Sequence, residues 1–275
     1  MLGVDVAPSA LNLARGYPKA GNEFYQEGDF LTCTSVTRSS FDILFEHTCL
    51  CAIPLERRTD YVRAAAAALR DEGLDAQACA ADAADEAAIE TLVQELLARH
   101  GRLDLMLCNA GGGQGSDIAP AIRRDDLEAT LRKNVSTTLV CAQAAARAMI
   151  PRGGGAIVTV GSIHGSLGSD PRLYAPEFRR SSQSYHAAKG AILNLTRALA
   201  CEWAAHGITV NCISPGQIPK ATIDAVTRER FRNQVPLGRL GVPEDLRGAI
   251  ALFASPAGRW ITGQNLVVDG GWSAW

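Results

Sequence analysis

The stretch SYHAAKGAILNLTRALACEWAAHGITVNCISPG, residues 184–216, decides the fold of this chain. It begins with a long, alanine-rich helical pattern, and Gly207 can end the helix because glycine accepts a left-handed terminal conformation. ITVNCIS then has the apolar composition of a buried strand, which Pro215 and Gly216 end. A helix that leads directly into a buried strand predicts a βαβ unit and therefore a parallel sheet.

The same alternation continues on both sides of this stretch. LDLMLCNAG and GAIVTVGS, residues 103–111 and 155–162, predict buried strands, and residues 125–150 between them predict a helix. Toward the C-terminus, residues 242–255 predict a capped helix and residues 262–272 a final strand. Together they predict an α/β fold: a Rossmann-like, doubly wound parallel sheet in three α/β/α layers, with an atypical N-terminal segment.

Composition narrows the class of function. The 275 residues are 47% hydrophobic and 20% charged, with a net charge of −2, so they favour small-molecule chemistry over nucleic-acid or membrane-surface binding. The eight cysteines lack the spacing of a zinc site, and we expect reduced thiols and no metal. No targeting pattern opens the chain and no apolar segment is long enough to cross a bilayer, so we expect a cytoplasmic protein.

Tyr185 and Lys189 are four residues apart on a predicted helix, so their side chains project from one face. A nearby cation favours the phenolate and lowers the pKa of a tyrosine from its reference value of about 10. The pair can therefore act as a proton donor and acceptor. Taken alone, such a pair is more often a surface contact.

Ser162 and Asn134 add two polar groups to this picture. Ser162 follows a predicted strand, and ligands of open α/β sheets bind at the carboxyl ends of their strands. Asn134 lies within a predicted helix, where its amide can anchor a water or orient a lysine. Separately, the serine is equally typical of a turn and the asparagine of a solvated helix position.

The motifs around these residues resemble the short-chain dehydrogenase/reductase family over residues 64–275, about three quarters of the chain. The segments that carry the resemblance are CNAGGG, KNVSTT, VGSIHG, SYHAAKGAI, NCISPG and PLGRLGVPEDL. The resemblance implies a catalytic set of Asn134, Ser162, Tyr185 and Lys189. It implies that Tyr185 and Lys189 also bind cofactor, together with Asp82, Ala83, Asn109, Ala110, Gly111, Pro215, Gly216 and Ile218.

The implied activity is hydride transfer between NAD or NADP and an alcohol or carbonyl substrate of the sugar-acid, polyol or 3-oxoacyl type. Tyr185 would exchange a proton with the oxygen held by Ser162, Lys189 would hold the nicotinamide ribose, and Asn134 would complete a water-linked relay. The resemblance also implies a homo-tetramer or homo-dimer packed through the Asn134 and Tyr185 helices.

The first 63 residues do not fit this family, whose members begin with a strand and a TGxxxGxG turn that holds the pyrophosphate. They resemble instead a fragment of a class I S-adenosylmethionine-dependent methyltransferase, with Asp5 at the ribose position and Asp29 and Phe30 at the adenine turn. We therefore divide the chain at residue 63. The alternative is that LGVDVAPSA is a divergent first strand and turn of the dehydrogenase.

If the two parts share one sheet, LGVDV takes the place of the first strand and FDILFEH, residues 41–47, that of the second. Asp5 and Pro8 then face the pyrophosphate, which a carboxylate repels and to which proline offers no donor. The ranked hypotheses are an oxidoreductase with impaired cofactor binding, a methyltransferase fragment, and an inactive binding module. Residues 163–184 exceed the family's usual spacing and form either a substrate lid or a solvated loop.

Overall fold

The structure is a computed structural model of the 275-residue chain. It describes the backbone of residues 43–46 and, in full, residues 66–67, 70–71, 73, 75–113, 118–175, 180–219 and 223–275. The expectations for Asp5, Pro8, Asp29 and Phe30 lie outside these residues. In the described part, no helix is both long and apolar enough to span a membrane.

The described strands form one parallel sheet in the order β1-β2-β3-β4-β5. They are β1 (Ile43–Glu46), β2 (Leu105–Cys108), β3 (Gly155–Val160), β4 (Ile208–Pro215) and β5 (Asn265–Val268). The strands expected within residues 103–111, 155–162 and 262–272 are confirmed as β2, β3 and β5, and β4 is the strand of the opening stretch.

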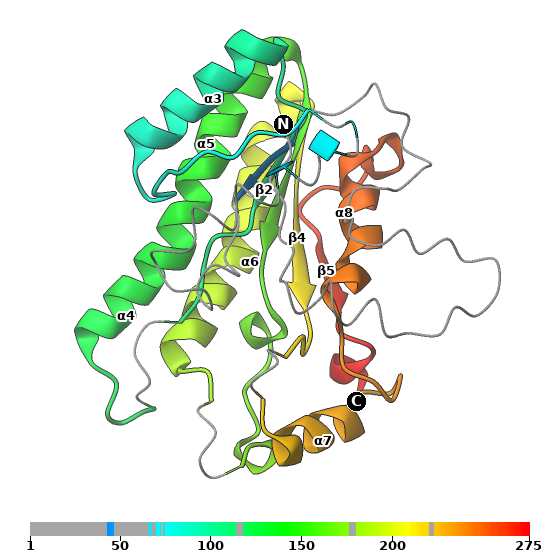
Figure 1. The fold of residues 1–275 in the computed structure, drawn as a ribbon. Helices are drawn as coiled ribbons and strands as arrows, with labels where there is room; N and C mark the ends of the chain where they lie inside the picture. The colour runs from blue at the N-terminus through cyan, green and yellow to red at the C-terminus, as the bar shows by residue number, and fades with distance from the viewer. Residues whose placement is uncertain are drawn as a thin grey trace, which may run out of the picture.

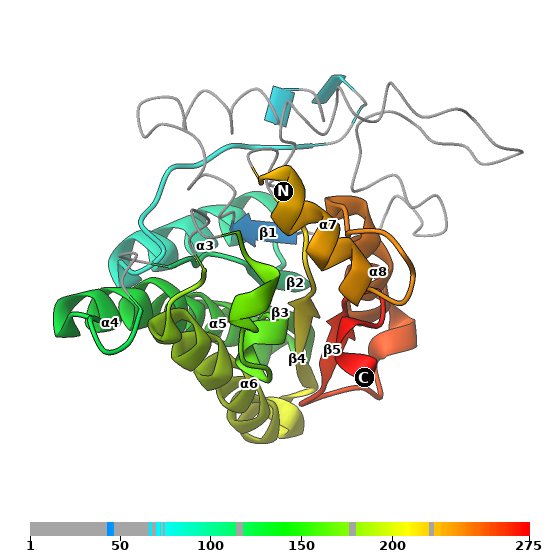
Figure 2. The same ribbon diagram turned by 90° about the horizontal axis from the view of Figure 1, so that it is seen from below.

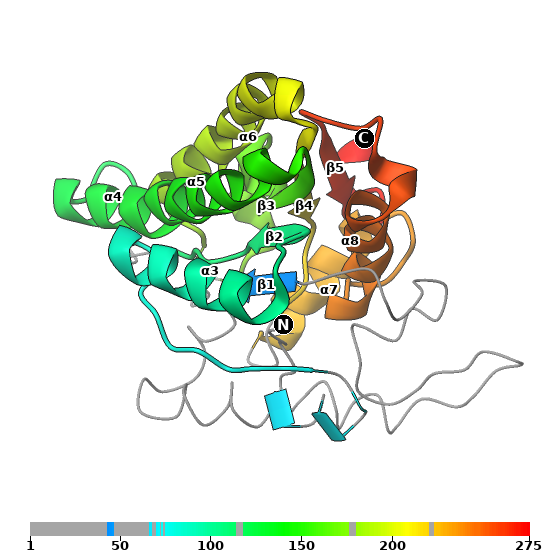
Figure 3. The ribbon, with the colours of Figure 1, turned by 90° about the horizontal axis from the view of Figure 1, so that it is seen from above.

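Helices cover both faces of this sheet, which confirms the three-layer α/β/α architecture (Figures 1 and 3). On one face lie α3 (Glu86–His100), α5 (Thr137–Met149) and α6 (Gln183–Trp203), with α4 (Arg124–Leu131) extending from α5. On the other face lies α8 (Arg247–Ala254), and α7 (Ala225–Gln234) lies near the end of β4 (Figure 2).

Alternating side chains of β2 enter the two cores of the sheet. Met106 and Cys108 pack in the cluster that α3 and α5 complete, whereas Leu105 and Leu107 pack with Phe253 of α8. All five side chains are almost fully buried. Truncating a buried leucine of this kind to alanine costs about 2–5 kcal/mol of stability, so the continuous apolar composition of the strand is what fixes it between two helix layers.

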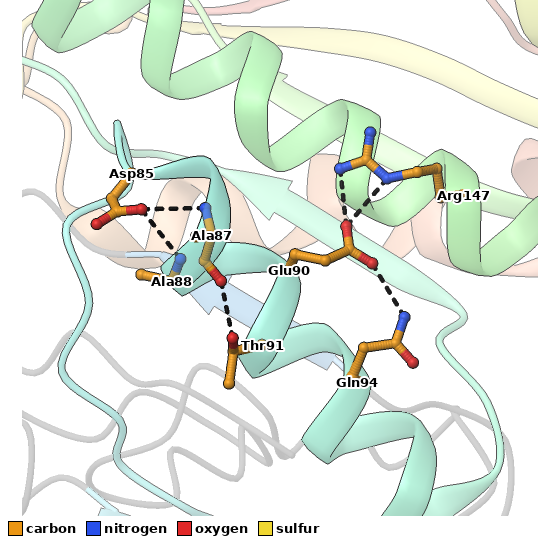
Figure 4. A network of polar contacts seen from close by, with 7 residues as sticks. All are labelled: Asp85, Ala87, Ala88, Glu90, Thr91, Gln94 and Arg147. Carbon is orange, nitrogen blue, oxygen red and sulfur yellow. Dashed lines mark hydrogen bonds and ion pairs between the residues drawn. The ribbon is translucent and has the colours of Figure 1, made fainter.

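A polar network links α3 to α5 at the surface (Figure 4). Asp85 caps α3 by accepting hydrogen bonds from the backbone N–H groups of residues 87 and 88. One turn further, Glu90 accepts from Gln94 and forms an ion pair with Arg147 of α5, 2.7 Å from Nη2 to Oε2. Exposed pairs of this type contribute about 0–1 kcal/mol, so burial rather than charge holds α3 in place.

The place of β1 in the sheet corrects one expectation. Ile43 pairs with Leu105 and Glu46 with Cys108, so FDILFEH does form a strand, directly beside β2. In the Rossmann strand order 3-2-1-4-5-6, the first strand pairs with the fourth strand, where the order reverses. The motif that follows β2 assigns β2 to this fourth place. Residues 43–46 therefore occupy the place that we expected LGVDV to take, and not that of the second strand.

Candidate active site at the carboxyl ends of the strands

The start of α6 carries Tyr185 and Lys189 at the end of the sheet where the strands finish. The two residues are one turn apart, and Lys189 Nζ lies 5.7 Å from the centroid of the Tyr185 ring. The lysine is 4% exposed, and its ammonium donates to the carbonyl oxygen of Val160, the last residue of β3, over 2.7 Å. The predicted pairing of a phenol with a cation is therefore present, with the cation anchored to a strand end.

Asn134 is fully buried in a turn of π-helix, Arg132–Ser136, between α4 and α5. Its Nδ2 donates to the carbonyl oxygens of Gly112 and Thr130, each over 2.8 Å, and its Oδ1 accepts from the N–H of Gly112 over 3.0 Å. Both amide protons are thus committed to backbone. π turns inside helices occur frequently at functional sites, and here the turn aims the amide at the segment that follows β2.

Gly111 is the point where this segment meets both side chains. A Cβ at this position would overlap Asn134 Oδ1 and lie 3.4 Å from Lys189 Nζ. Only glycine lets the backbone pass so close to an amide and an ammonium at once. The structure therefore brings together three of the predicted residues, which come from three separate elements.

Ser162 follows β3 and begins the 3₁₀ turn Ile163–Gly165. Its Oγ accepts a hydrogen bond from the N–H of His164 over 3.1 Å, and the serine is 8% exposed. The His164 ring lies edge-on to that of Tyr185, with centroids 6.2 Å apart. Gly165 holds the turn against α6, since a Cβ there would be 2.9 Å from the carbonyl oxygen of Lys189. Ser162 and Tyr185 thus flank one histidine.

The other predicted cofactor residues lie at three places along the same edge. Asn109 and Ala110 continue from β2, and the carbonyl oxygen of Ala110 accepts from Thr137 Oγ1 of α5 over 3.5 Å. Ala83 is buried in the core beneath α3. Asp82 is exposed, with its Oδ2 lying 3.9 Å from Arg132 of the π turn that holds Asn134.

Pro215, Gly216 and Ile218 form the exit from β4. The N–H of Gly216 donates to the carbonyl oxygen of Val268 over 2.9 Å, and a Cβ at Gly216 would overlap Asp269. Gly216, Gln217 and Ile218 line a recess of about 140 Å³. Within the described residues, Gln217 Nε2 is buried and has no hydrogen-bond partner.

The donor set at this edge suits the nicotinamide half of a dinucleotide. A buried amide without a protein partner among the described residues suits a polar ligand group, and a cation and a phenol on one helix suit a ribose hydroxyl. The residues that follow β1, where a pyrophosphate turn belongs in the Rossmann order, lie outside the described part.

The sequence-based prediction missed Gln217 and a cluster around His164. Ser169 Oγ lies 2.9 Å from His186 Nε2 and 3.4 Å from His164 Nδ1, and the two rings are 4.6 Å apart. Burial, and next the neighbouring His186, lower the pKa of His164 to about 4. A signal was available: one histidine follows Ser162 by two residues, and the other directly follows Tyr185.

Comparison with known proteins tests the family resemblance. A family model described as enoyl-(acyl carrier protein) reductase matches residues 53–273, and so begins inside the segment that we set apart. Cyclohexanol dehydrogenase from a Rhodococcus species is 35% identical over 210 residues, which are 74% of this chain and 75% of that protein.

Two solved structures share the fold. A gluconate 5-dehydrogenase from Burkholderia cenocepacia, in complex with NADP and tartrate, is 32% identical with a TM-score of 0.70, covering 80% of this chain and 84% of that one. A short chain dehydrogenase from Leptospira borgpetersenii with bound NAD⁺ is 30% identical with a TM-score of 0.64, covering 70% and 74%. From its strand order, its motifs and these matches, the chain belongs to the short-chain dehydrogenase/reductase family.

Proposed function

We propose that this chain is an NAD(P)-dependent oxidoreductase that acts on CH–OH groups, with Tyr185 as its proton donor and acceptor. The observation that carries the proposal is the placement of Lys189, whose ammonium lies beside the Tyr185 ring, donates to the end of β3 and meets Asn134 at Gly111. Relatives that oxidise alcohols and neighbours that hold NADP or NAD⁺ support the reaction and the cofactor.

When bound, the nicotinamide accepts or supplies the hydride at the carbinol or carbonyl carbon. Lys189 favours the phenolate of Tyr185 because its buried ammonium lies beside the ring. Tyr185 can then take the proton of an alcohol or return it to a carbonyl oxygen. Ser162 Oγ already accepts from the N–H of His164, so its own proton remains available for the substrate oxygen.

In this proposal Asn134 orients Lys189 and does not itself react. Its two amide protons hold the backbone of Gly112 and Thr130, which leaves one acceptor site on Oδ1. Oδ1 and Lys189 Nζ crowd the same Cβ position at Gly111. We assign Asn134 the orientation of the lysine ammonium, directly or through one water. The remaining predicted cofactor residues keep the assignments that the family resemblance implies.

We also propose that this chain binds NAD(P) weakly. The residues after β1 read HTCLCAIP, residues 47–54, and no TGxxxGxG turn precedes Asp82. Without that turn the pyrophosphate lacks a cradle of backbone N–H groups. The division of the chain at residue 63, and the methyltransferase resemblance before it, stay predictions that rest on sequence alone.

We propose that the substrates are secondary alcohols and the corresponding ketones. We also propose that the protein is cytoplasmic. Cyclohexanol and gluconate, named for two similar proteins, both offer a secondary carbinol. The test is oxidation of cyclohexanol by the purified protein with millimolar NAD⁺ or NADP⁺, followed by the absorbance of the reduced nicotinamide. Turnover that disappears in Tyr185→Phe supports the proposal, and turnover unchanged in that variant contradicts it.

A further inference from the structure

A recess of about 470 Å³ lies between the turn after β3 and the start of α6, next to Tyr185. Its walls are rich in hydrogen-bonding groups, among them Ser169, Gln183 and the two imidazoles of His164 and His186. Arg180 is the one charged side chain among the described residues that line it, and none of those residues is acidic. The mechanism proposed above uses none of these side chains.

The hydrogen bonds around Ser169 fix which nitrogen of each ring carries the proton. His186 Nδ1 lies 2.9 Å from the carbonyl oxygen of Ser182, and because a carbonyl only accepts, Nδ1 carries a proton. His186 Nε2 is then the acceptor for the Ser169 hydroxyl, 2.9 Å away. The serine oxygen in turn accepts from His164 Nδ1 over 3.4 Å. This order leaves Nε2 of His164 as the acceptor of its ring.

His164 keeps this neutral state at physiological pH, because burial and the neighbouring His186 lower its pKa to about 4. The ring centroid lies 6.2 Å from that of Tyr185, and the residue belongs to the turn begun by Ser162. A hydrogen-bond acceptor is thus held beside the place where the reacting carbinol would stand. Such a group suits a second hydroxyl on the neighbouring carbon of a substrate.

Arg180 lines the same recess as Ser169 and His164. Burial raises the pKa of the Tyr174 hydroxyl, while a hydrogen bond with Ser169 and the positive charge of Arg180 act in the opposite direction. Arg180, Tyr174 and Ser169 are therefore near one another. Among the described residues, the acid closest to Arg180 in sequence is Asp170, which accepts hydrogen bonds from both Nε and Nη2 of Arg172. The positive charge that faces the recess is that of Arg180.

We propose that this recess is a specificity subsite for the carboxylate end of a polyhydroxy acid, in which Arg180 pairs with the carboxylate and His164 accepts from a hydroxyl next to the reacting carbon. The inference rests on the proposed function, since it places the reacting carbinol at Tyr185. Arginine suits this task because its planar guanidinium binds a carboxylate through two hydrogen bonds.

The experiment compares D-gluconate with D-glucitol, which share a carbon chain and differ in whether one end is a carboxylate or a neutral alcohol. We expect kcat/KM to favour gluconate by about tenfold or more, and Arg180→Gln to lower that preference by about tenfold to hundredfold, mostly through KM. The matched control is Arg172→Gln, in the same segment, whose side chain is 88% exposed and paired with Asp170. It leaves the preference unchanged.

His164 is tested by removal and rescue. His164→Leu lowers kcat/KM for both polyhydroxy probes relative to cyclohexanol, and His164→Gln, which keeps an acceptor, restores part of the loss. Equal loss for cyclohexanol would show a merely structural role for the histidine and overturn its part in the subsite.

Calorimetric titration of gluconate and glucitol in the presence of millimolar NADH or NADPH separates this inference from the proposed function. If neither cyclohexanol nor gluconate is oxidised, the proposed function fails, and tighter binding of gluconate that depends on Arg180 still supports the subsite. Gluconate binding that is absent, equal to that of glucitol, or unchanged in Arg180→Gln overturns the subsite, whether or not the enzyme turns over cyclohexanol.

Discussion

Two regions of this chain differ in how well they suit a dinucleotide cofactor. At the carboxyl ends of β2 and β3, Asn134, Lys189 and Gly111 interlock so closely that a single added Cβ would collide with an amide oxygen. After β1, the sequence offers HTCLCAIP where relatives of this fold place a glycine turn. The reaction chemistry and the grip on the pyrophosphate are separate parts of such an enzyme. One can be retained while the other is replaced.

The sharpest way to test this contrast is to supply the missing part. Replacing residues 1–63 with a strand and a TGxxxGxG turn should tighten NAD(P)H binding by about a thousandfold or more. Several backbone hydrogen bonds to a charged group, each worth about 1.5–3 kcal/mol, account for this gain. Dissociation constants from titration of NADH fluorescence give the answer.

The control is the same chimera with alanine at each glycine of the turn, which restores the length but not the close backbone approach. A smaller graft of the turn onto residues 47–54 asks whether β1 can serve as its strand. Micromolar binding of NAD(P)H by the unaltered chain would show that the existing segment already holds the pyrophosphate.

Removing the proton donor tests the other region. Tyr185→Phe keeps the ring beside His164 and Lys189 but loses the hydroxyl, and we expect kcat to fall by about a hundredfold to ten-thousandfold. Steady-state oxidation of cyclohexanol measures the loss, and an unchanged thermal unfolding curve shows that the fold is intact. Residual turnover near that of the original chain would assign proton transfer to another group.

Lys189→Ala probes the cation beside the phenol. The pH at which activity reaches half its maximum should rise by about one unit or more, because the charge that favours the phenolate is gone. The carbonyl oxygen of Val160 also loses its buried donor, which costs about 1–3 kcal/mol of stability. A pH–rate profile with an unmoved midpoint would mean that the ammonium has only a structural role.

The neutral state of His164 predicts how stability depends on pH. Its pKa is about 4 in the folded protein, against 6.5 for an unperturbed histidine, so the unfolded chain binds more protons between these values. The free energy of unfolding is therefore highest above pH 6.5. It decreases as the pH falls toward 4, by as much as about 3 kcal/mol.

Urea titrations at several pH values measure this slope, and His164→Asn should flatten it. His206→Asn, which alters an exposed histidine in the 3₁₀ turn after α6, serves as the control. An equal slope in the chain and in His164→Asn would assign the acid sensitivity to other groups.

The smallest effect concerns assembly. We expect a homo-dimer or homo-tetramer packed through α5 and α6, in keeping with the closed symmetry of most soluble oligomers. Ala198→Glu places a charge on the exposed face of α6 and should shift the assembly toward smaller species in light scattering. Monomers of the unaltered chain at micromolar concentration would contradict the prediction.

Periodicity and composition were sufficient for the strands after residue 103 and for helices α5, α6 and α8, but they did not predict α7. LMLC and GAIVTV could be identified because they are buried on both faces. The helix that starts at Gln183 runs to Trp203 and continues as a 3₁₀ turn, which Gly207 ends in the left-handed conformation. The active-site residues came from motif order, and their roles stay predictions. Their convergence at Gly111 is a finding of the structure.

The features that sequence reasoning missed all depend on contacts between distant residues. β1 takes its place through pairing with a strand about sixty residues later, a partner that no local pattern specifies. The π turn at residues 132–136 has ordinary helix-forming neighbours, and its amide finds Gly112 only in the folded chain. The Ser169 cluster needs the extra residues between Ser162 and Tyr185 to fold back on α6.

The π turn also sets the phase between two helices. A single π turn holds one residue more than the α-helical turn it replaces, so α4 and α5 run along nearly one line with their faces out of step by about 100°. Deleting one residue between 132 and 136 would restore an unbroken α-helix and rotate α4 relative to α5 by that angle. The chain then cannot both keep α5 buried against the sheet and point Asn134 at Gly112. The extra residue of the π turn thus sets the rotation between α4 and α5, and the proposed active site depends on that rotation.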